Sequence, residues 1–145
     1  MTGLVLAVFV AWCAWLTVID LRERRLPNAL TAGGAVAVLL FAAMTGRWSA
    51  ALIGGLLLFA VYLVVHLVAP GALGAGDVKL AFALGAAVAL AGGQAWVTAA
   101  LLAPVGTALA GSLLWLRGGR ARAPTVVAHG PGMCLASLIA LALSM

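Results

Sequence analysis

Residues 50–69 read AALIGGLLLFAVYLVVHLVA, a stretch of 20 residues that contains no Asp, Glu, Lys or Arg. A helix of about 20 predominantly apolar residues is long enough to cross the hydrocarbon core of a bilayer, which is about 30 Å thick. This stretch is therefore predicted to form a helix that spans a membrane.

The rest of the chain has the same apolar character. Of its 145 residues, 66% are hydrophobic and 8% are charged, whereas about 25% of the residues of an average soluble domain are charged. This composition excludes an ordinary soluble protein, and the large apolar fraction excludes an intrinsically disordered chain. The sequence predicts one all-α membrane domain over residues 1–145, a polytopic bundle of about six transmembrane helices. The apolar stretches are 3–19, 28–45, 50–69, 78–93, 95–116 and 126–144.

Three details of this prediction have alternatives. The break at residues 92–94 is the weakest, so a bundle with five spans is a second interpretation. The first stretch lacks a basic segment and a small-residue cleavage site, so we expect a retained helix rather than a signal peptide. Cys13 and Cys134 have no CxxC spacing, so we expect buried free thiols rather than zinc ligands or a disulfide.

The basic residues predict the orientation of the chain, because short cytoplasmic loops are enriched in Lys and Arg. With the N-terminus outside, seven of the eight basic residues fall in cytoplasmic loops, and Arg47 alone lies outside. Both termini are therefore expected outside, and the three acids Asp20, Glu23 and Asp77 at the cytoplasmic face. The net charge of +5 favours contact with anionic membrane lipids, and no aromatic-rich basic patch indicates nucleic-acid binding.

Asp20 ends the first apolar stretch. One interpretation is a polar flank that stops the helix at the lipid headgroups. However, a negative charge at the C-terminus of a helix opposes the helix dipole, and a basic residue would suit this place better. Asp20 is therefore a candidate functional carboxylate. Glu23 lies among three arginines and is expected to face water without a catalytic role.

Asp77 follows Gly74 and Gly76 and directly precedes an apolar stretch. The structural interpretation is a helix N-cap, a position at which Asp is common. Two features favour a functional interpretation. The glycines permit another chain segment to approach closely, and residues 78–91 would form a helix only about 21 Å long. We therefore expect Asp77 to be recessed into the membrane, where an ionised carboxylate costs about 2.5–3.5 kcal/mol.

Asp20 and Asp77 are expected at a similar depth in the membrane. Two neighbouring carboxyls in a site of low dielectric constant share a proton and titrate as a coupled pair. Such a pair can hydrolyse a peptide bond without a metal, because one carboxylate accepts a proton from water while the other carboxyl protonates the substrate carbonyl. The sequence contains no HExxH zinc motif and no GxSxG nucleophile motif.

Two functions from other classes are alternatives to proteolysis. A small membrane carrier or channel component could use Asp20 and Asp77 as proton-relay groups, and it would need a polar path to both membrane faces. A purely structural membrane subunit is the third interpretation, and it leaves the loop around Asp77 unexplained.

Two segments resemble the signature blocks of the type IV prepilin peptidases, which are GxGD membrane aspartic proteases. Residues 20–31, DLRERRLPNALT, resemble the first block, in which Pro-Asn follows an Asp at a fixed distance. Residues 74–80, GAGDVKL, resemble the second block, the GxGD motif with its trailing Lys-Leu. The resemblance spans nearly the whole chain, and the compact form is similar to the short peptidases of tight-adherence (Flp-type) pilus systems.

The resemblance implies an aspartic endopeptidase of the bacterial plasma (inner) membrane that serves type IV pilus assembly or protein secretion. It implies that Asp20 and Asp77 form the catalytic pair, without cofactor or metal. The implied partner is a prepilin, whose leader peptide precedes an apolar helix and is removed at the cytoplasmic face. Because there is no CxxC motif, the N-terminal domain of long members and its methyltransferase activity are not expected. Residues 129–132, HGPG, resemble a degraded third block.

The resemblance also indicates supporting motif residues, namely Gly74, Gly76, Pro27, Asn28 and Lys79. Lys79, the only lysine, has two possible roles, which are to tune the carboxyl pair or to contact headgroups. Asn28 is expected to cap the helix of residues 28–45, and a hydrogen bond to the Asp of the first block is the alternative.

Two further patterns concern the packing of helices. Tyr62 and His66 are four residues apart and share a helix face, and His66 is expected to have a structural or interfacial role. Small residues recur at every fourth position from 81 to 93 and permit close helix contact. This pattern could bring the first and fourth helices together, or it could serve the scaffold alone.

Overall fold

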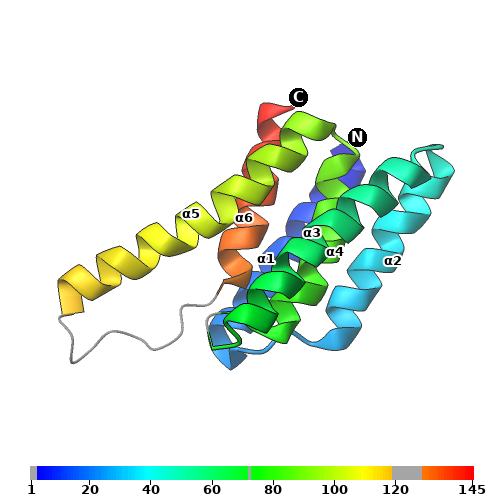
Figure 1. Ribbon diagram of the computed structural model, residues 1–145. Helices are drawn as coiled ribbons and strands as arrows, with labels where there is room; N and C mark the ends of the chain where they lie inside the picture. The colour runs from blue at the N-terminus through cyan, green and yellow to red at the C-terminus, as the bar shows by residue number, and fades with distance from the viewer. Residues whose placement is uncertain (1–2, 72, 119–128) are drawn as a thin grey trace.

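The computed structural model of the protein describes residues 3–71, 73–118 and 129–145. Within these ranges the chain forms six α-helices joined by short connections (Figure 1). The helices are α1 (Gly3–Glu23), α2 (Asn28–Met44), α3 (Trp48–Val68), α4 (Ala75–Ala89), α5 (Gly93–Gly118) and α6 (Gly130–Leu143).

The described helices confirm the predicted all-α membrane bundle. Three of them contain segments long and apolar enough to cross a membrane, which are Gly3–Glu23, Trp48–Val68 and Gly93–Leu113. Helices α2 and α6 are shorter apolar helices. The break expected at residues 92–94 is present, because a turn that contains Gly92 at a φ of 120° separates α4 from α5.

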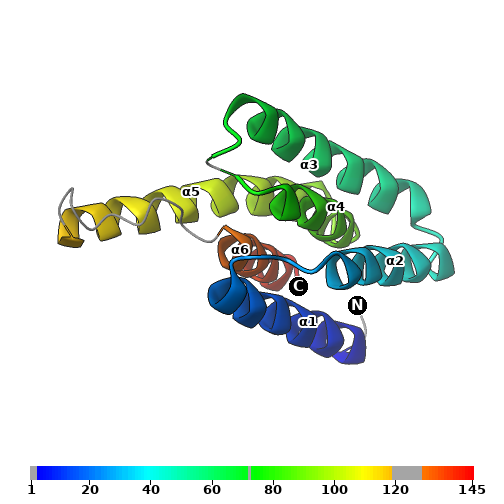
Figure 2. The ribbon, with the colours of Figure 1, turned by 90° about the horizontal axis from the view of Figure 1, so that it is seen from below.

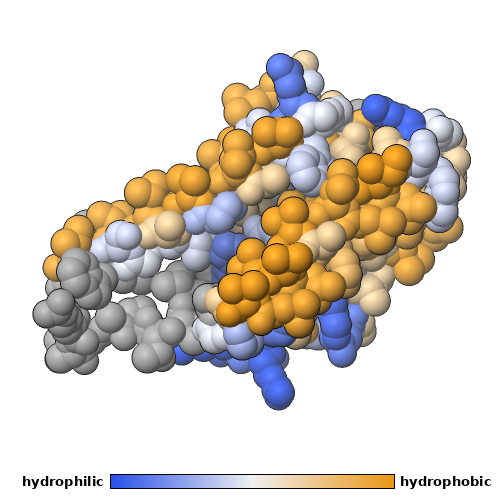
Figure 3. Space-filling view, in the orientation of Figure 1, coloured by the Kyte–Doolittle hydropathy of each residue, from blue (hydrophilic) through white to orange (hydrophobic). Residues whose placement is uncertain are grey.

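The surface of the bundle is apolar along its sides. Figure 3 shows hydrophobic side chains covering the flanks of the helices on one face, with hydrophilic side chains near the ends. Large apolar side chains such as Leu4, Val61 and Leu101 are exposed. Such a surface is costly in water and suits the hydrocarbon core of a bilayer, so the helices are arranged as those of a membrane protein.

Helix α4 forms the centre of the bundle. Most of its 15 residues are buried, and it contacts α2, α3, α5 and α6. Figure 2 shows α4 and α6 between α3 on one side and α1 on the other. Helix α1 packs against α6, and the buried free thiols Cys13 of α1 and Cys134 of α6 belong to the same hydrophobic core. The prediction of buried free thiols is confirmed.

Small residues bring α3 and α4 into very close contact. A Cβ atom at Gly54 would lie 2.3 Å from the Cβ of Ala89, and one at Gly85 would lie 2.6 Å from the carbonyl oxygen of Gly54. The indole nitrogen of Trp96 donates a hydrogen bond to the same carbonyl oxygen, at 2.9 Å. Of the two alternatives for the small residues, the contacts of Gly85 and Ala89 support a role in the scaffold, because both face α3. Helix α1 packs against α6 instead.

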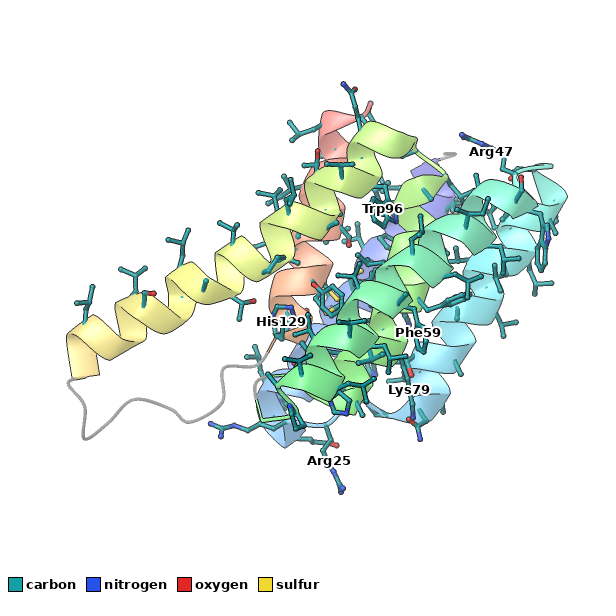
Figure 4. The ribbon with its side chains drawn as sticks, in the orientation of Figure 1. Arg25, Arg47, Phe59, Lys79, Trp96 and His129 are labelled. Carbon is teal, nitrogen blue, oxygen red and sulfur yellow. The ribbon has the colours of Figure 1, made fainter. Side chains whose placement is uncertain are left out.

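The two ends of the bundle carry different groups. Both chain termini and Arg47 lie at one end (Figures 1 and 4), where Arg47 donates a hydrogen bond to the carbonyl oxygen of Leu90 just beyond α4. A cation at this place complements the dipole of α4. Arg25 and Lys79 lie at the opposite end (Figure 4), where α1 ends and α4 begins.

We expect Gly85→Ala to destabilise the protein. Its Cβ would collide with the backbone of Gly54 and the side chain of Leu58, so α3 and α4 would have to separate. Overpacking of this kind costs about 1–3 kcal/mol, and the midpoint of thermal unfolding in detergent should fall. Gly33→Ala is the control, because a Cβ at position 33 meets no atom within 4 Å. Equal midpoints for the two variants would contradict the close contact.

Candidate active site

Asp20 lies in the last turn of α1, and its side chain is buried, with 7% of the residue surface exposed. Within the described residues, its Oδ2 atom has no hydrogen-bond partner. A buried carboxyl oxygen without a partner is costly, and a catalytic role is one explanation for such a group in a native structure. Helix α1 extends four residues beyond the predicted end of the first span, so Asp20 belongs to the helix rather than to its flank.

The neighbour of this carboxyl group is the backbone at the start of α6. A Cβ atom at Gly130 would lie 2.7 Å from the Oδ2 of Asp20, so only glycine fits here without a shift. Pro131 occupies the first turn of α6, where its fixed φ suits a helix start. The dipole at the C-terminus of α1 disfavours the charge of Asp20, whereas the dipole at the N-terminus of α6 favours it.

Asp77 lies in the first turn of α4, which begins at Ala75 with Gly74 as its N-cap. The backbone N–H of Gly74 donates a hydrogen bond to the Oδ2 of Asp77, at 3.2 Å. The interpretation of Asp77 as an N-cap is therefore wrong, because the helix begins before it. Asp77 is half-buried, and the backbone N–H of Gly74 holds its carboxylate in place.

Leu26 packs beside both candidate carboxylates, against Gly76 next to Asp77 and against Gly130, which faces Asp20. A Cβ atom at Gly76 would lie 3.1 Å from the Cβ of Leu26, and one at Gly130 would lie 3.6 Å from its Cδ1. The next residue, Pro27, is the N-cap of α2. The α1–α2 connection therefore contacts α4 at Gly76 and α6 at Gly130. The glycines allow this connection to pack against α4 and α6 at once.

Both aspartates line one cavity of about 310 Å³ at this end of the bundle. Arg24, Arg25 and Lys79 also line the cavity and are exposed, so the cavity opens toward water. The other lining residues are Leu26, Asn28, Gly74, Ala75 and Gly76. The cavity therefore unites the two candidate catalytic residues and all the supporting motif residues except Pro27.

Lys79 and Asn28 form a link between α4 and α2. The Lys79 ammonium group donates a hydrogen bond to the Oδ1 of Asn28, at 2.8 Å. Both interpretations of Asn28 are wrong, because its side chain makes no capping hydrogen bond to α2 and accepts from Lys79 rather than meeting Asp20. The first and second motif blocks are thus joined by this hydrogen bond as well as by the shared cavity.

A tyrosine and a histidine from α3 and the start of α6 contact one another, and the sequence patterns did not connect them. The Tyr62 hydroxyl and the Nε2 atom of His129 are 3.2 Å apart. Burial lowers the pKa of His129, so its ring is neutral at pH 7. His66 is engaged elsewhere, because its Nδ1 donates to the carbonyl oxygen of Leu73 at 2.7 Å, which agrees with the structural role expected for it. The resemblance of residues 129–132, HGPG, to a third motif block was the one feature of the sequence that indicated a role for the start of α6.

The profile of the type IV leader peptidase family matches residues 7–117, which is more than half of the chain and includes Asp20 and Asp77. The match ends within α5, before α6. No curated protein and no solved structure matches the chain.

We expect cysteines placed around the cavity to react with a bulky, water-soluble maleimide at very different rates. In a chain with Cys13 and Cys134 replaced by Ala, Arg24→Cys should react fastest because position 24 is exposed. Asp77→Cys should react several times more slowly, and Asp20→Cys most slowly of all, because of their burial. Labelling rates followed by mass spectrometry measure this order, and equal rates at positions 24 and 77 would refute the recessed site.

Proposed function

The chain belongs to the type IV leader peptidase family, and we propose that it is an aspartic endopeptidase that cleaves the leader from type IV (Flp-like) prepilins with Asp20 and Asp77. One observation carries the proposal. Carboxylates from the end of α1 and the start of α4, which are 57 positions apart in the sequence, line the same water-accessible cavity.

The chemistry follows from the proximity of the two carboxyl groups. Because like charges repel at short range in a partly buried site, the pair holds one proton between them near neutral pH. The ionised carboxylate accepts a proton from a water molecule, and the resulting hydroxide attacks the peptide carbonyl carbon. The protonated carboxyl donates to the carbonyl oxygen, and collapse of the tetrahedral intermediate transfers a proton to the leaving amine. No cofactor or metal enters this scheme.

The distribution of charge supports cleavage at the cytoplasmic face of a bacterial plasma membrane. Arg24, Arg25 and Lys79 line the cavity, whereas Arg47 lies at the end with both termini (Figures 1 and 4). Basic residues accumulate on the cytoplasmic side, so the cavity faces the cytoplasm and both termini face outward. A prepilin would then hold its leader in the cytoplasm and its apolar helix in the bilayer beside the enzyme.

The proton-relay alternative is less well supported. A carrier that used Asp20 and Asp77 would need polar groups along a path to the other membrane face. Between the cavity and the opposite end, the core of the bundle holds large apolar side chains, including Leu16, Leu84 and Val88, which are almost completely buried. Water and protons have no polar path through these residues, so hydrolysis at one face fits better than transport.

We expect Asp20→Asn and Asp77→Asn each to slow leader removal at least about a hundredfold, because general acid–base catalysis by one group contributes about 10²–10⁴. The measurement is the loss of the leader from a co-expressed prepilin of a tight-adherence pilus system, followed on a gel. Glu23→Gln is the matched control, because Glu23 is an exposed acid at the end of the same helix, and it should process normally.

Two results of this experiment would contradict the proposed mechanism. The first is normal processing by either Asn variant. The second is complete loss of wild-type activity in EDTA, which would indicate a metal-dependent reaction. Retained activity in EDTA together with two inactive Asn variants is the result we expect.

We expect Gly130→Ala to lower the rate of leader removal at least about tenfold, since a displacement of 1 Å at a reacting group can cost about 10²-fold. The new Cβ would lie 2.7 Å from the Oδ2 of Asp20, so the carboxyl group must move. Gly106→Ala on α5 is the control, because a Cβ there meets no atom within 4 Å. If both variants cleave at the wild-type rate, close contact with α6 does not position Asp20.

A further inference from the structure

The start of α6 is tied to α3 by a hydrogen bond in an apolar setting. Tyr62, in the second half of α3, is buried with 6% of its surface exposed. Its hydroxyl lies 3.2 Å from the Nε2 of His129, and the two rings pack with their centres 5.5 Å apart. Figure 4 shows His129 at the start of α6, on the side that faces α3.

The surroundings of this pair strengthen the hydrogen bond. Tyr62 and His129 line a hollow of about 350 Å³ between α3 and α5, whose other lining side chains are mainly apolar, such as Val61, Val65 and Leu73. A hydrogen bond in an apolar environment is stronger than one in water, and it is costly to leave either partner unpaired. The pair therefore fixes the position of the residue that follows His129.

That residue is Gly130, whose backbone lies against the carboxyl group of Asp20. His129 also begins the helix, because its carbonyl oxygen accepts a hydrogen bond from the N–H of Met133, at 3.1 Å. On the other side, Tyr62 belongs to α3, which packs against α4, the helix that carries Asp77. The pair thus stands between the segments that hold the two aspartates.

We propose that Tyr62 and His129 are positioning residues of the peptidase: their hydrogen bond holds the amino end of α6, with Gly130, against Asp20 and so sets Asp20 relative to Asp77. This inference rests on the proposed function. Neither side chain takes part in bond breaking, and neither is needed to bind the leader. Removal of the hydrogen bond should therefore reduce kcat and leave KM nearly unchanged.

Four variants test this proposal in proteoliposomes with a purified tight-adherence prepilin as substrate. Tyr62→Phe and His129→Leu each remove the hydrogen bond and should lower kcat about tenfold, with KM within about twofold of wild type. The double variant should be no slower than the single variants, since both remove one interaction. His129→Gln keeps a hydrogen-bonding group and should restore most of the rate. Ser137→Ala is the control, because the Ser137 hydroxyl donates its hydrogen bond within α6, to the carbonyl of Met133.

A second measurement does not depend on activity. In the chain without Cys13 and Cys134, the maleimide reaction of Asp20→Cys should be several times faster when Tyr62→Phe is also present, because α6 no longer covers position 20. The control substitution Ser137→Ala should leave this labelling rate unchanged. An equal rate with and without the Tyr62 hydroxyl would overturn the proposal.

The outcomes separate this proposal from the proposed function. If the wild-type protein does not cleave the prepilin, the proposed function fails, while the labelling experiment still tests the contact. If the wild-type protein cleaves and Tyr62→Phe has the wild-type kcat, the positioning role is wrong. Losses that multiply in the double variant, or a rise of KM with constant kcat, would also overturn it. If the Tyr62→Phe protein does not fold, the kcat and KM of His129→Leu and His129→Gln test the positioning role by the same criteria.

Discussion

The contact between the buried carboxyl group of Asp20 and the amino end of α6 is the interaction on which the candidate site depends. The C-terminus of α1 disfavours a negative charge, and the N-terminus of α6 supplies the opposite end of a helix dipole. Gly130 makes this contact possible because it has no Cβ to occupy the space beside Oδ2. As a consequence, the last helix of the chain closes over the end of the first, and Asp20 remains buried beside the cavity that it shares with Asp77.

Close packing around α4 holds the second carboxylate in place. Gly54 and Gly85 let the backbones of α3 and α4 approach until no side-chain atom fits between them, and Arg47 binds the carbonyl of Leu90 just beyond α4. A helix held in this way cannot slide along its axis without breaking these contacts. Asp77, in its first turn, is therefore presented at a defined depth, where the backbone of Gly74 holds its carboxylate.

Local sequence patterns predicted the helices well, since apolar runs and charged breaks act on neighbouring residues, and they singled out the two candidate carboxylates. They failed where the partner is distant in the chain. The beginning of α4 at Ala75 was missed because the glycines before Asp77 suggested a loop. The Asn28 side chain was expected to cap its own helix, but the Lys79 ammonium group competes for it from a helix 51 positions away. The small residues of α4 were correctly seen as a contact surface, whereas the identity of the facing helix depended on packing.

The amino-acid sequence by itself determined that this protein is an apolar helical bundle with two acids, Asp20 and Asp77, in motifs at the ends of apolar stretches. The tertiary structure alone decided that these acids share a cavity and that Gly130 covers one of them. It also decided that Tyr62 and His129 meet beside them. The physical reason is that helix formation and membrane insertion depend on the character of contiguous residues, whereas an active site depends on the approach of groups from separate helices. That approach is set by which side chains are small enough to let the helices touch.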